Sequence, residues 1–246
     1  DLAAACVACT EAASKAIRQI ADPNTRLKAD GSFVTDADFA AQGVIVQAIR
    51  GISEDVRIVG EESAEEMAAH IGRYAFLNDN VLKRTKHEIR LRYHRKQVET
   101  LPLAQGLSAA GPDAYETPED ELFDGDPEDC WVDTSRVGVI VDPLDGTKSY
   151  ANGEYDAVSV LVCIILDFQP YFGVIGKPFG YIAEANLSSM LDTSCVTIYG
   201  GPLLRGVYIA GGRMIEATPV SEGELPRAVI SGSRSKGVVH EFCVFL

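Results

Sequence analysis

An apolar segment that runs directly into acidic residues is the part of this sequence that most clearly indicates chemistry. Residues 137–153 read VGVIVDPLDGTKSYANG, so Asp142 and Asp145 follow a run of apolar and small residues and stand three positions apart. Acidic side chains at the end of a buried strand are unfavourable unless a cation lies beside them, because desolvation and mutual repulsion both oppose ionisation. The segment therefore predicts a cation site.

A second acidic pair follows another short apolar run. Glu61 and Glu62 come directly after residues 56–60, VRIVG, which are typical of a buried strand. If the two strands are neighbours, the acids meet at one edge of a sheet. Carboxylate ligands without a histidine pattern favour magnesium or calcium over zinc. Asp142 and Asp145 are expected to flank a turn at Pro143 and Leu144, whose kink would expose the Leu144 carbonyl as a further hard oxygen ligand.

The residues after Asp145 add a site for an anion. Gly146 and Thr147 are expected to open a helical turn, whose free N–H groups and partial positive charge suit a phosphate. Metal ligands beside an anion cradle are the layout that metal-assisted phosphoester hydrolysis requires. An Asx turn that caps a helix explains this segment equally well by itself; the second acidic strand end favours the metal site.

The elements that must position these residues alternate between helical and extended patterns. Residues 2–21 predict an amphipathic helix that ends before Pro23. Thr35 is a predicted N-cap with Asp38 as its capping-box partner, and the helix is expected to run to about Arg50. Strands are predicted at 56–60, 136–142, 157–166 and 171–178, the last two as a hairpin, and at 228–235.

Residues 73–130 differ in character and are interpreted as an insertion that is partly mobile. The run LKRTKHEIRLRYHRKQ, residues 82–97, is strongly basic and is compatible with a helix, whereas ETPEDELFDGDPEDC, residues 116–130, is acidic and lacks apolar periodicity. Two readings stay open. In the favoured reading, both runs are faces exposed to solvent. In the alternative, the basic run binds a polyanion.

The composition restricts the class of partner. The chain has 246 residues, is 46% hydrophobic, and carries a formal net charge of −14. This charge argues against a nucleic-acid polymer or an anionic membrane as the main partner, although a bound metal ion still allows an anionic small substrate. No uncharged apolar run approaches the ~18 residues of a membrane span. The oligomeric state is not indicated.

The cysteines and the N-terminus bear on the compartment. Six cysteines are scattered through the chain, mostly among apolar residues, which is typical of reduced buried thiols. A cytoplasmic location is therefore predicted, with an organelle as the alternative. The sequence begins at Asp1 without methionine, so its N-terminus gives no targeting signal to interpret.

Three segments in order resemble one enzyme superfamily. KADGSFVTDAD at 28–38, IVGEES at 58–63 and IVDPLDGTKSYANGEYDAVSVLVCI at 140–164 resemble motifs of the lithium-sensitive, magnesium-dependent phosphatases. That superfamily holds inositol monophosphatases, inositol polyphosphate 1-phosphatases, fructose-1,6-bisphosphatases and 3'(2'),5'-bisphosphate nucleotidases. Lys148 and the segment 153–162 look most like the nucleotidases. SGSRSKG, residues 231–237, is similar to their nucleotide-contacting loop: Ser233 matches, and Lys236 replaces a histidine.

The resemblance implies a set of metal ligands. Glu61, Asp142 and the Leu144 carbonyl would hold a first magnesium ion, and Asp142 with Asp145 would hold a second. Glu61 would contribute to a third, more weakly held ion. Lithium is the inhibitor that the resemblance implies.

The resemblance also implies roles for residues around the metal site. Asp38, hydrogen-bonded to Thr147, would orient or deprotonate the attacking water, with a purely structural capping role as the alternative for Asp38. The amides of Gly146 and Thr147 would take the phosphate, Ser233 would contact the substrate, and Glu62 would support the ligands rather than bind metal.

The implied fold is α+β, a layered α-β-α-β-α sandwich of the sugar-phosphatase type. Residues 1–180 would form the metal-binding phosphatase domain and 181–246 a partial α/β domain. The family's later W-D-x-x-A motif, whose aspartate completes the second metal site, has no counterpart, since Trp131 is followed by valine. We therefore expect a truncated chain with an incomplete C-terminal part and impaired activity.

The favoured function is hydrolysis of a phosphomonoester on a small, multiply phosphorylated substrate. Adenosine 3',5'-bisphosphate, converted to AMP, is the favoured substrate. An inositol phosphate or polyphosphate is one alternative. A metal- or nucleotide-binding pseudo-phosphatase, without turnover, is the other.

Overall fold

The computed structural model describes eight stretches of the chain: residues 1–20, 24–29, 31–68, 79–100, 132–180, 195–204, 206–211 and 213–215. The chain divides into a compact unit, Asp1–Ile215, and a second unit, Glu216–Leu246. All of the described residues belong to the first unit. The predicted strand at 228–235 and the predicted substrate residue Ser233 lie outside the described residues.

A seven-stranded sheet forms the centre of the described fold, in the order β3-β4-β5-β6-β7-β8-β9. β3 pairs with β4 in parallel, and every later pair is antiparallel. The strands are β3 (Arg57–Gly60), β4 (Val137–Asp145), β5 (Ser159–Leu166), β6 (Gln169–Lys177), β7 (Val196–Gly200), β8 (Val207–Ile209) and β9 (Arg213–Ile215). The four strands predicted between 56 and 178 are confirmed, including the hairpin.

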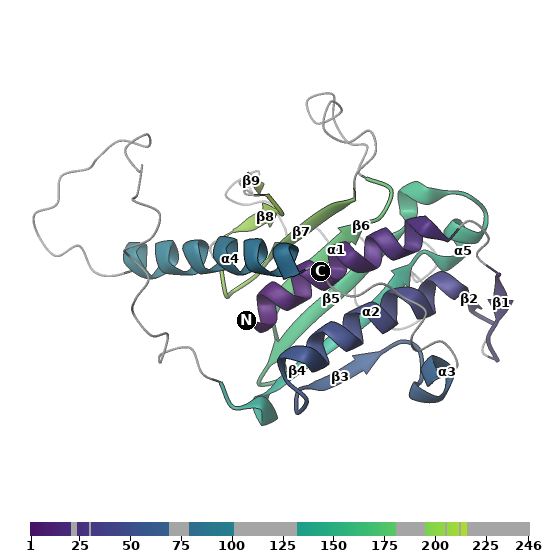
Figure 1. Cartoon of the computed structure of the whole chain (residues 1–246), viewed down its shortest axis with the longest axis horizontal. Helices are drawn as coiled ribbons and strands as arrows, with labels where there is room; N and C mark the ends of the chain where they lie inside the picture. Colours follow the sequence, from purple (N-terminus) through teal and green to yellow (C-terminus); the bar gives the residue numbers. More distant parts are fainter. Residues whose placement is uncertain are drawn as a thin grey trace, which may run out of the picture. The chain divides into compact units, whose positions relative to one another are not determined.

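Two helices, α1 (Leu2–Gln19) and α2 (Asp36–Ile52), pack against each other and cover one face of this sheet (Figure 1). α1 lies against β5, β6 and β7, and α2 lies against β4. The alanine-rich sequence of α1 permits this close approach, and most of its side chains are buried. The buried side chains of β4, β5 and β6 alternate with more exposed ones, as expected for a sheet covered on one face.

The basic run of the predicted insertion forms part of a long helix, α4 (Asp79–Thr100), which packs on α1. Arg84 forms an ion pair of 3.0 Å with Glu11 of α1. The Arg92 guanidinium stacks over the ring of Tyr208, 4.3 Å from its centroid, and also hydrogen-bonds the Tyr199 hydroxyl. These contacts attach α4 to the sheet as well as to α1. The other part of the predicted insertion, 101–131, lies outside the described residues.

The remaining elements are short. They are β1 (Arg26–Leu27), β2 (Phe33–Val34), α3 (Ala64–Ala68), α5 (Thr147–Ala151) and the 3-10 turns η2 (Thr134–Arg136) and η3 (Tyr155–Ala157). β1 and β2 form a separate antiparallel hairpin. Together with α3 and α5 it lies at the end of the sheet where the acidic residues were predicted to meet (Figure 1).

The predicted α+β class is confirmed by this combination of helices and a many-stranded sheet. The described residues form a sheet with a helical layer on it. The full α-β-α-β-α layering stays a prediction. β7, β8 and β9, which follow the predicted boundary at residue 180, extend the same sheet as β6. The division into 1–180 and 181–246 stays a prediction. None of the helices within the described ranges has the length and apolarity needed to cross a bilayer.

Two glycines of β6 allow the packing of α1 on the sheet to be tested. A Cβ at Gly176 would lie 2.6 Å from Ser14 Oγ and 2.7 Å from Thr10 Cγ2, both on α1, whereas a Cβ at Gly173 would meet nothing within 4 Å. Gly176→Ala is therefore expected to lower the free energy of unfolding in urea by about 1–3 kcal/mol, because it overpacks this contact. Gly173→Ala is the matched control; an equal loss in both variants would contradict the packing described here.

Candidate active site

The parallel register of β3 and β4 brings the two acidic strand ends together. Gly60, the last residue of β3, pairs with Val141 of β4, so Glu61 and Asp142 are the next residues along two adjacent strands that run in the same direction. This is the arrangement that the sequence predicted. In place of the expected turn at Pro143, β4 continues to Asp145 through an irregularity that shifts its pairing with β5 between Asp142 and Asp145. The irregular residues bend the strand without ending it.

The carboxylates at this end of the sheet repel one another. The pKa of Asp142 is raised to about 7, first by burial and then by the nearby charges of Glu61 and Asp145, with the Glu61 carboxylate also within hydrogen-bonding reach. Asp142 Oδ1 is buried without a hydrogen-bond partner. Asp145 accepts a long hydrogen bond of 3.5 Å from the Ser159 hydroxyl. Three of the predicted metal ligands therefore interact with one another in the folded chain.

Asp38 performs its capping role and reaches Thr147 at the same time. Its Oδ2 accepts hydrogen bonds from the backbone N–H of Thr35 at 2.8 Å and from the Thr35 hydroxyl at 2.6 Å, which completes the predicted capping box. Its Oδ1 lies 3.3 Å from Thr147 Oγ1. The side chain is buried, which raises its pKa to about 6. The two readings of Asp38 are thus geometrically compatible, because each uses a different oxygen.

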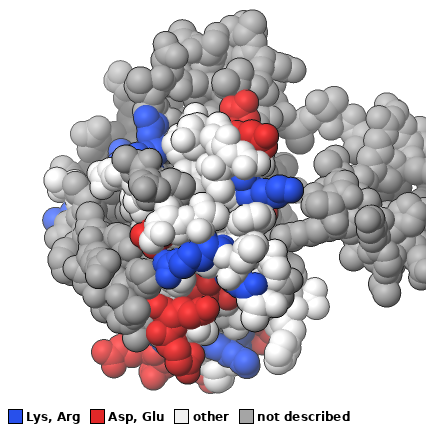
Figure 2. All heavy atoms as spheres, turned by 90° about the vertical axis from the view of Figure 1, so that its right-hand side faces the viewer, with Lys and Arg blue, Asp and Glu red and all other residues white. Residues whose placement is uncertain are grey.

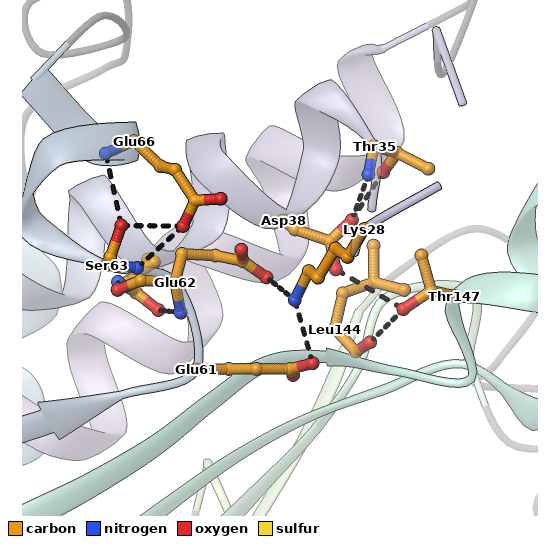
Figure 3. A network of polar contacts seen from close by, with 10 residues as sticks. Lys28, Thr35, Asp38, Glu61, Glu62, Ser63, Glu66, Leu144 and Thr147 are labelled. Carbon is orange, nitrogen blue, oxygen red and sulfur yellow. Dashed lines mark hydrogen bonds and ion pairs between the residues drawn. The ribbon is translucent and has the colours of Figure 1, made fainter. Parts of the chain in front are cut away.

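The Thr147 hydroxyl connects Asp38 to the bend of β4. Thr147 Oγ1 lies 3.0 Å from the Leu144 carbonyl oxygen as well as near Asp38. A hydroxyl has one proton, so Leu144 and Asp38 compete for it. Both acceptors are residues that the sequence analysis selected for the site, and Figure 3 shows them converging on Thr147.

Gly146 shapes the start of α5. Its backbone is left-handed, with φ 86°, and a Cβ there would lie 2.8 Å from the Ala157 carbonyl oxygen. Glycine is therefore required both by conformation and by space. The predicted helical turn after Gly146 is confirmed as α5, while phosphate binding by the amides of Gly146 and Thr147 stays a prediction.

Lys28 is a site residue that the sequence analysis did not select. Its ammonium lies 3.1 Å from Glu61 Oε1 and 2.7 Å from Glu62 Oε1, and the turn between β1 and β2 carries it there (Figure 3). Glu62 is buried, and its Oε2 has no hydrogen-bond partner. The position of Lys28 at the start of the KADGSFVTDAD segment, which ends in the capping box, is the signal that was available.

Glu62 is held on its backbone as well as on its side chain. Gln42 of α2, also missed from the sequence, is buried and hydrogen-bonds both the N–H and the C=O of Glu62. That Glu62 supports the ligands instead of binding metal stays a prediction.

The donor set suits a hard divalent cation. Carboxylates and a backbone carbonyl are the ligands that magnesium prefers, and the unpartnered Asp142 Oδ1 marks where negative charge is left uncompensated. Within the described ranges, no three Asp, Glu, His or Cys side chains are drawn together closely enough to hold a metal ion as they stand. Lys28 contacts Glu61 and Glu62, and Asp142 interacts with Glu61 and Asp145, so the types of donor fit a hard divalent cation.

The surface around the site shows the same mixture of charge. In Figure 2, which views the end of the molecule where β1, β2, α3 and α5 lie, acidic side chains gather in one area. Lysine and arginine side chains border that area on the same face. This face of the molecule therefore carries charges of both signs, although the formal net charge of the chain is −14.

Comparison with known proteins gives a family match over nearly the whole chain. The family model described as the inositol monophosphatase family matches residues 1–242. A Candida albicans protein named 3'(2'),5'-bisphosphate nucleotidase 2 is 30% identical over 175 residues, covering 69% of this chain and 42% of that protein. A Drosophila pseudoobscura protein named putative inositol monophosphatase 3 is 31% identical over 110 residues, which are 44% of this chain and 26% of that protein.

Solved structures give weaker similarity. CysQ from Bacteroides thetaiotaomicron, titled a bacterial member of the inositol monophosphatase family, is 18% identical with a TM-score of 0.42, covering 89% of this chain and 52% of that one. The Thermotoga maritima IMPase is 16% identical with a TM-score of 0.45, covering 88% and 52%. The chain spans about half the length of these proteins and less than half of the curated relatives above.

Repulsion within the site predicts a pH-dependent stability of the metal-free chain. Because the folded-state pKa of Asp142 lies above the value of about 4 in an unfolded chain, its contribution to stability is present below about pH 4 and is lost as the pH rises through about 7. Asp142→Asn is therefore expected to raise the free energy of unfolding in EDTA at pH 8 by about 1 kcal/mol, after allowance for solvent screening of this half-buried group, with little gain at pH 4.5.

Urea denaturation at the two pH values measures this effect. Asp55→Asn is the control, because Asp55 is exposed and precedes β3, away from the acidic strand ends. A variant Asp142→Asn that is less stable than the wild type at pH 8 would show that the carboxylate is compensated in the metal-free chain.

Proposed function

Because the chain belongs to the inositol monophosphatase family, we propose that it hydrolyses a phosphomonoester on a small phosphorylated molecule with magnesium as its cofactor. The observation that carries the proposal is the meeting of Glu61, Asp142 and Asp145 at adjacent strand ends, beside the Asp38–Thr147 contact. Three segments distant in the sequence supply these residues. A capping function alone explains Asp38 but leaves the mutual repulsion of the other acids without a purpose.

Glu61, Asp142, Asp145 and the Leu144 carbonyl are the residues that would hold the metal ions. When bound, magnesium supplies charge neutralisation of the phosphate and a water of lowered pKa. The buried, unpartnered Asp142 Oδ1 and the raised pKa of Asp142 support this assignment, because both describe negative charge that lacks a counter-ion. Two or three ions are the number that the family resemblance implies.

Asp38 and Thr147 would orient the attacking water. The Thr147 hydroxyl proton is shared between the Leu144 carbonyl and Asp38 Oδ1. When the Thr147 hydroxyl donates its hydrogen bond to Asp38, its lone pairs remain available to accept a hydrogen bond from the attacking water. Thr35 holds Asp38 Oδ2 in place through two hydrogen bonds, so the direction of Asp38 Oδ1 is fixed before any substrate binds.

Adenosine 3',5'-bisphosphate is the substrate that the relatives favour. The Candida albicans nucleotidase matches over the longest part of the chain among the relatives described above, 69%. A human protein named Golgi-resident adenosine 3',5'-bisphosphate 3'-phosphatase is 30% identical over 104 residues. Inositol phosphate is the second candidate, because the Drosophila pseudoobscura relative carries that name.

Substitution of Asp145 tests the proposed activity. Asp145→Asn is expected to lower the rate of magnesium-dependent phosphate release by at least about 100-fold, because a neutral amide is a poor magnesium ligand. Asp55→Asn serves as the control and is expected to keep wild-type turnover. Near-complete activity in Asp145→Asn would refute the assignment. Metal binding without turnover in the wild type would identify a pseudo-phosphatase.

A substrate panel separates the two candidate substrates. Phosphate release is measured from adenosine 3',5'-bisphosphate, inositol 1-phosphate, inositol 1,4-bisphosphate and fructose 1,6-bisphosphate at saturating magnesium. We expect the highest kcat/KM with adenosine 3',5'-bisphosphate and inhibition by millimolar lithium. A preference for an inositol phosphate would assign the second candidate, and turnover insensitive to lithium would contradict the family-based expectation.

A further inference from the structure

Gln42 lies one helical turn after Asp38 on α2 and faces the same end of the sheet. Residues four apart lie on one side of a helix, and both side chains are buried. Asp38 reaches Thr147 from this face, and Gln42 reaches the end of β3. α2 therefore presents two polar side chains to the site, of which the proposed mechanism uses only one.

The Gln42 side-chain amide forms two hydrogen bonds with the backbone of Glu62. The Glu62 N–H donates to Gln42 Oε1 at 3.0 Å, and Gln42 Nε2 donates to the Glu62 carbonyl at 2.7 Å. The pairing of β3 with β4 ends at Gly60, before the two glutamates. The side-chain amide thus takes over the role of a neighbouring strand where the sheet no longer provides one.

The residue before the glutamates is fitted to this contact. A Cβ at Gly60 would lie 2.6 Å from the amide carbon of Gln42 and 2.6 Å from its Oε1. Heavy atoms do not approach so closely without displacement, so Gln42 occupies its position only because residue 60 is glycine. The contact is a matched pair of residues from α2 and β3.

We propose that Gln42 is a positioning residue that fixes the backbone of residues 60–62 so that the Glu61 carboxylate meets Asp142. Glu61 and Glu62 follow one another, so one anchored peptide directs both side chains. Glu62 reaches Lys28, and Glu61 lies near both Lys28 and Asp142. This inference rests on the proposed function, in which Glu61 is a magnesium ligand. Residues that orient metal ligands typically change metal affinity by about 10- to 100-fold when they are replaced.

Calorimetric titration of the full chain with MgCl2 at pH 8 tests the role without any measurement of turnover. Gln42→Met keeps the length of the side chain and removes both hydrogen bonds. It is expected to raise the Kd for Mg2+ by at least about 10-fold. Gln47→Met is the matched control, because Gln47 is exposed on the same helix, and its Kd is expected to stay within twofold of the wild type.

A second pair of variants separates positioning from general loss of stability. Gly60→Ala displaces the Gln42 amide by steric overlap and is expected to raise the Kd for Mg2+ and lower the urea midpoint. Adding Gln42→Ala to Gly60→Ala removes the overlap. We expect it to restore part of the midpoint while the Kd stays raised.

The outcomes are distinct. A Kd for Gln42→Met within twofold of the wild type, or a Kd that recovers together with the midpoint in the double variant, overturns the positioning role and leaves the proposed function standing. A wild-type chain that binds no Mg2+ overturns the proposed function, and the positioning role with it. A raised Kd in Gln42→Met and Gly60→Ala, with Gln47→Met unchanged, supports the inference.

Discussion

Repulsion between carboxylates that the fold forces together is the constraint on which this site depends. Glu61 and Asp142 follow adjacent strands at the same level, and Asp145 follows within the same irregular segment of β4. Carboxylates that are free in water stay apart because their negative charges repel one another. The sheet holds them together and partly buries them. Burial first, and then the charges of Glu61 and Asp145, raise the pKa of Asp142, and one of its oxygens is buried without a partner. Such an arrangement favours any divalent cation that enters, since the cation removes a destabilising interaction while it gains ligands.

The scaffold tolerates this repulsion because the rest of the fold is tightly packed. α1, α2 and the helix-facing side of the sheet share one large cluster of buried apolar side chains, which runs from Ile17 and Ile45 to Val160 and Phe172. The site lies at the edge of that cluster, where strands end and polar groups begin. The stability that hydrophobic burial contributes across the sheet therefore offsets the repulsion between a few carboxylates, as is common where stability and function conflict.

Polar side chains outside the predicted ligand set shape the acidic cluster. Lys28 contributes positive charge to Glu61 and Glu62, Gln42 anchors the Glu62 backbone, and Thr35 orients Asp38. They come from a hairpin turn, a helix interior and a helix cap. Asp38, Glu61 and Glu62 are thus held by side chains from three different elements in the absence of any ligand.

The sequence by itself determined helices α1 and α2, strands β3 to β6, the helical turn after Gly146, the capping box at Thr35 and Asp38, and the meeting of the acids after two strands. These follow from local patterns: apolar runs that end in acids, a Thr-x-x-Asp cap, and a glycine before a helical turn. It did not predict the β1–β2 hairpin or α3. It also did not find Lys28 or Gln42, and it predicted a turn where β4 bends and continues. Only the tertiary structure decided these points, because the charge partner of Glu62 lies 34 residues away and its backbone partner lies 20 residues away. A contact between segments so far apart depends on how α2, the β1–β2 hairpin and β3 pack together, which no local pattern specifies.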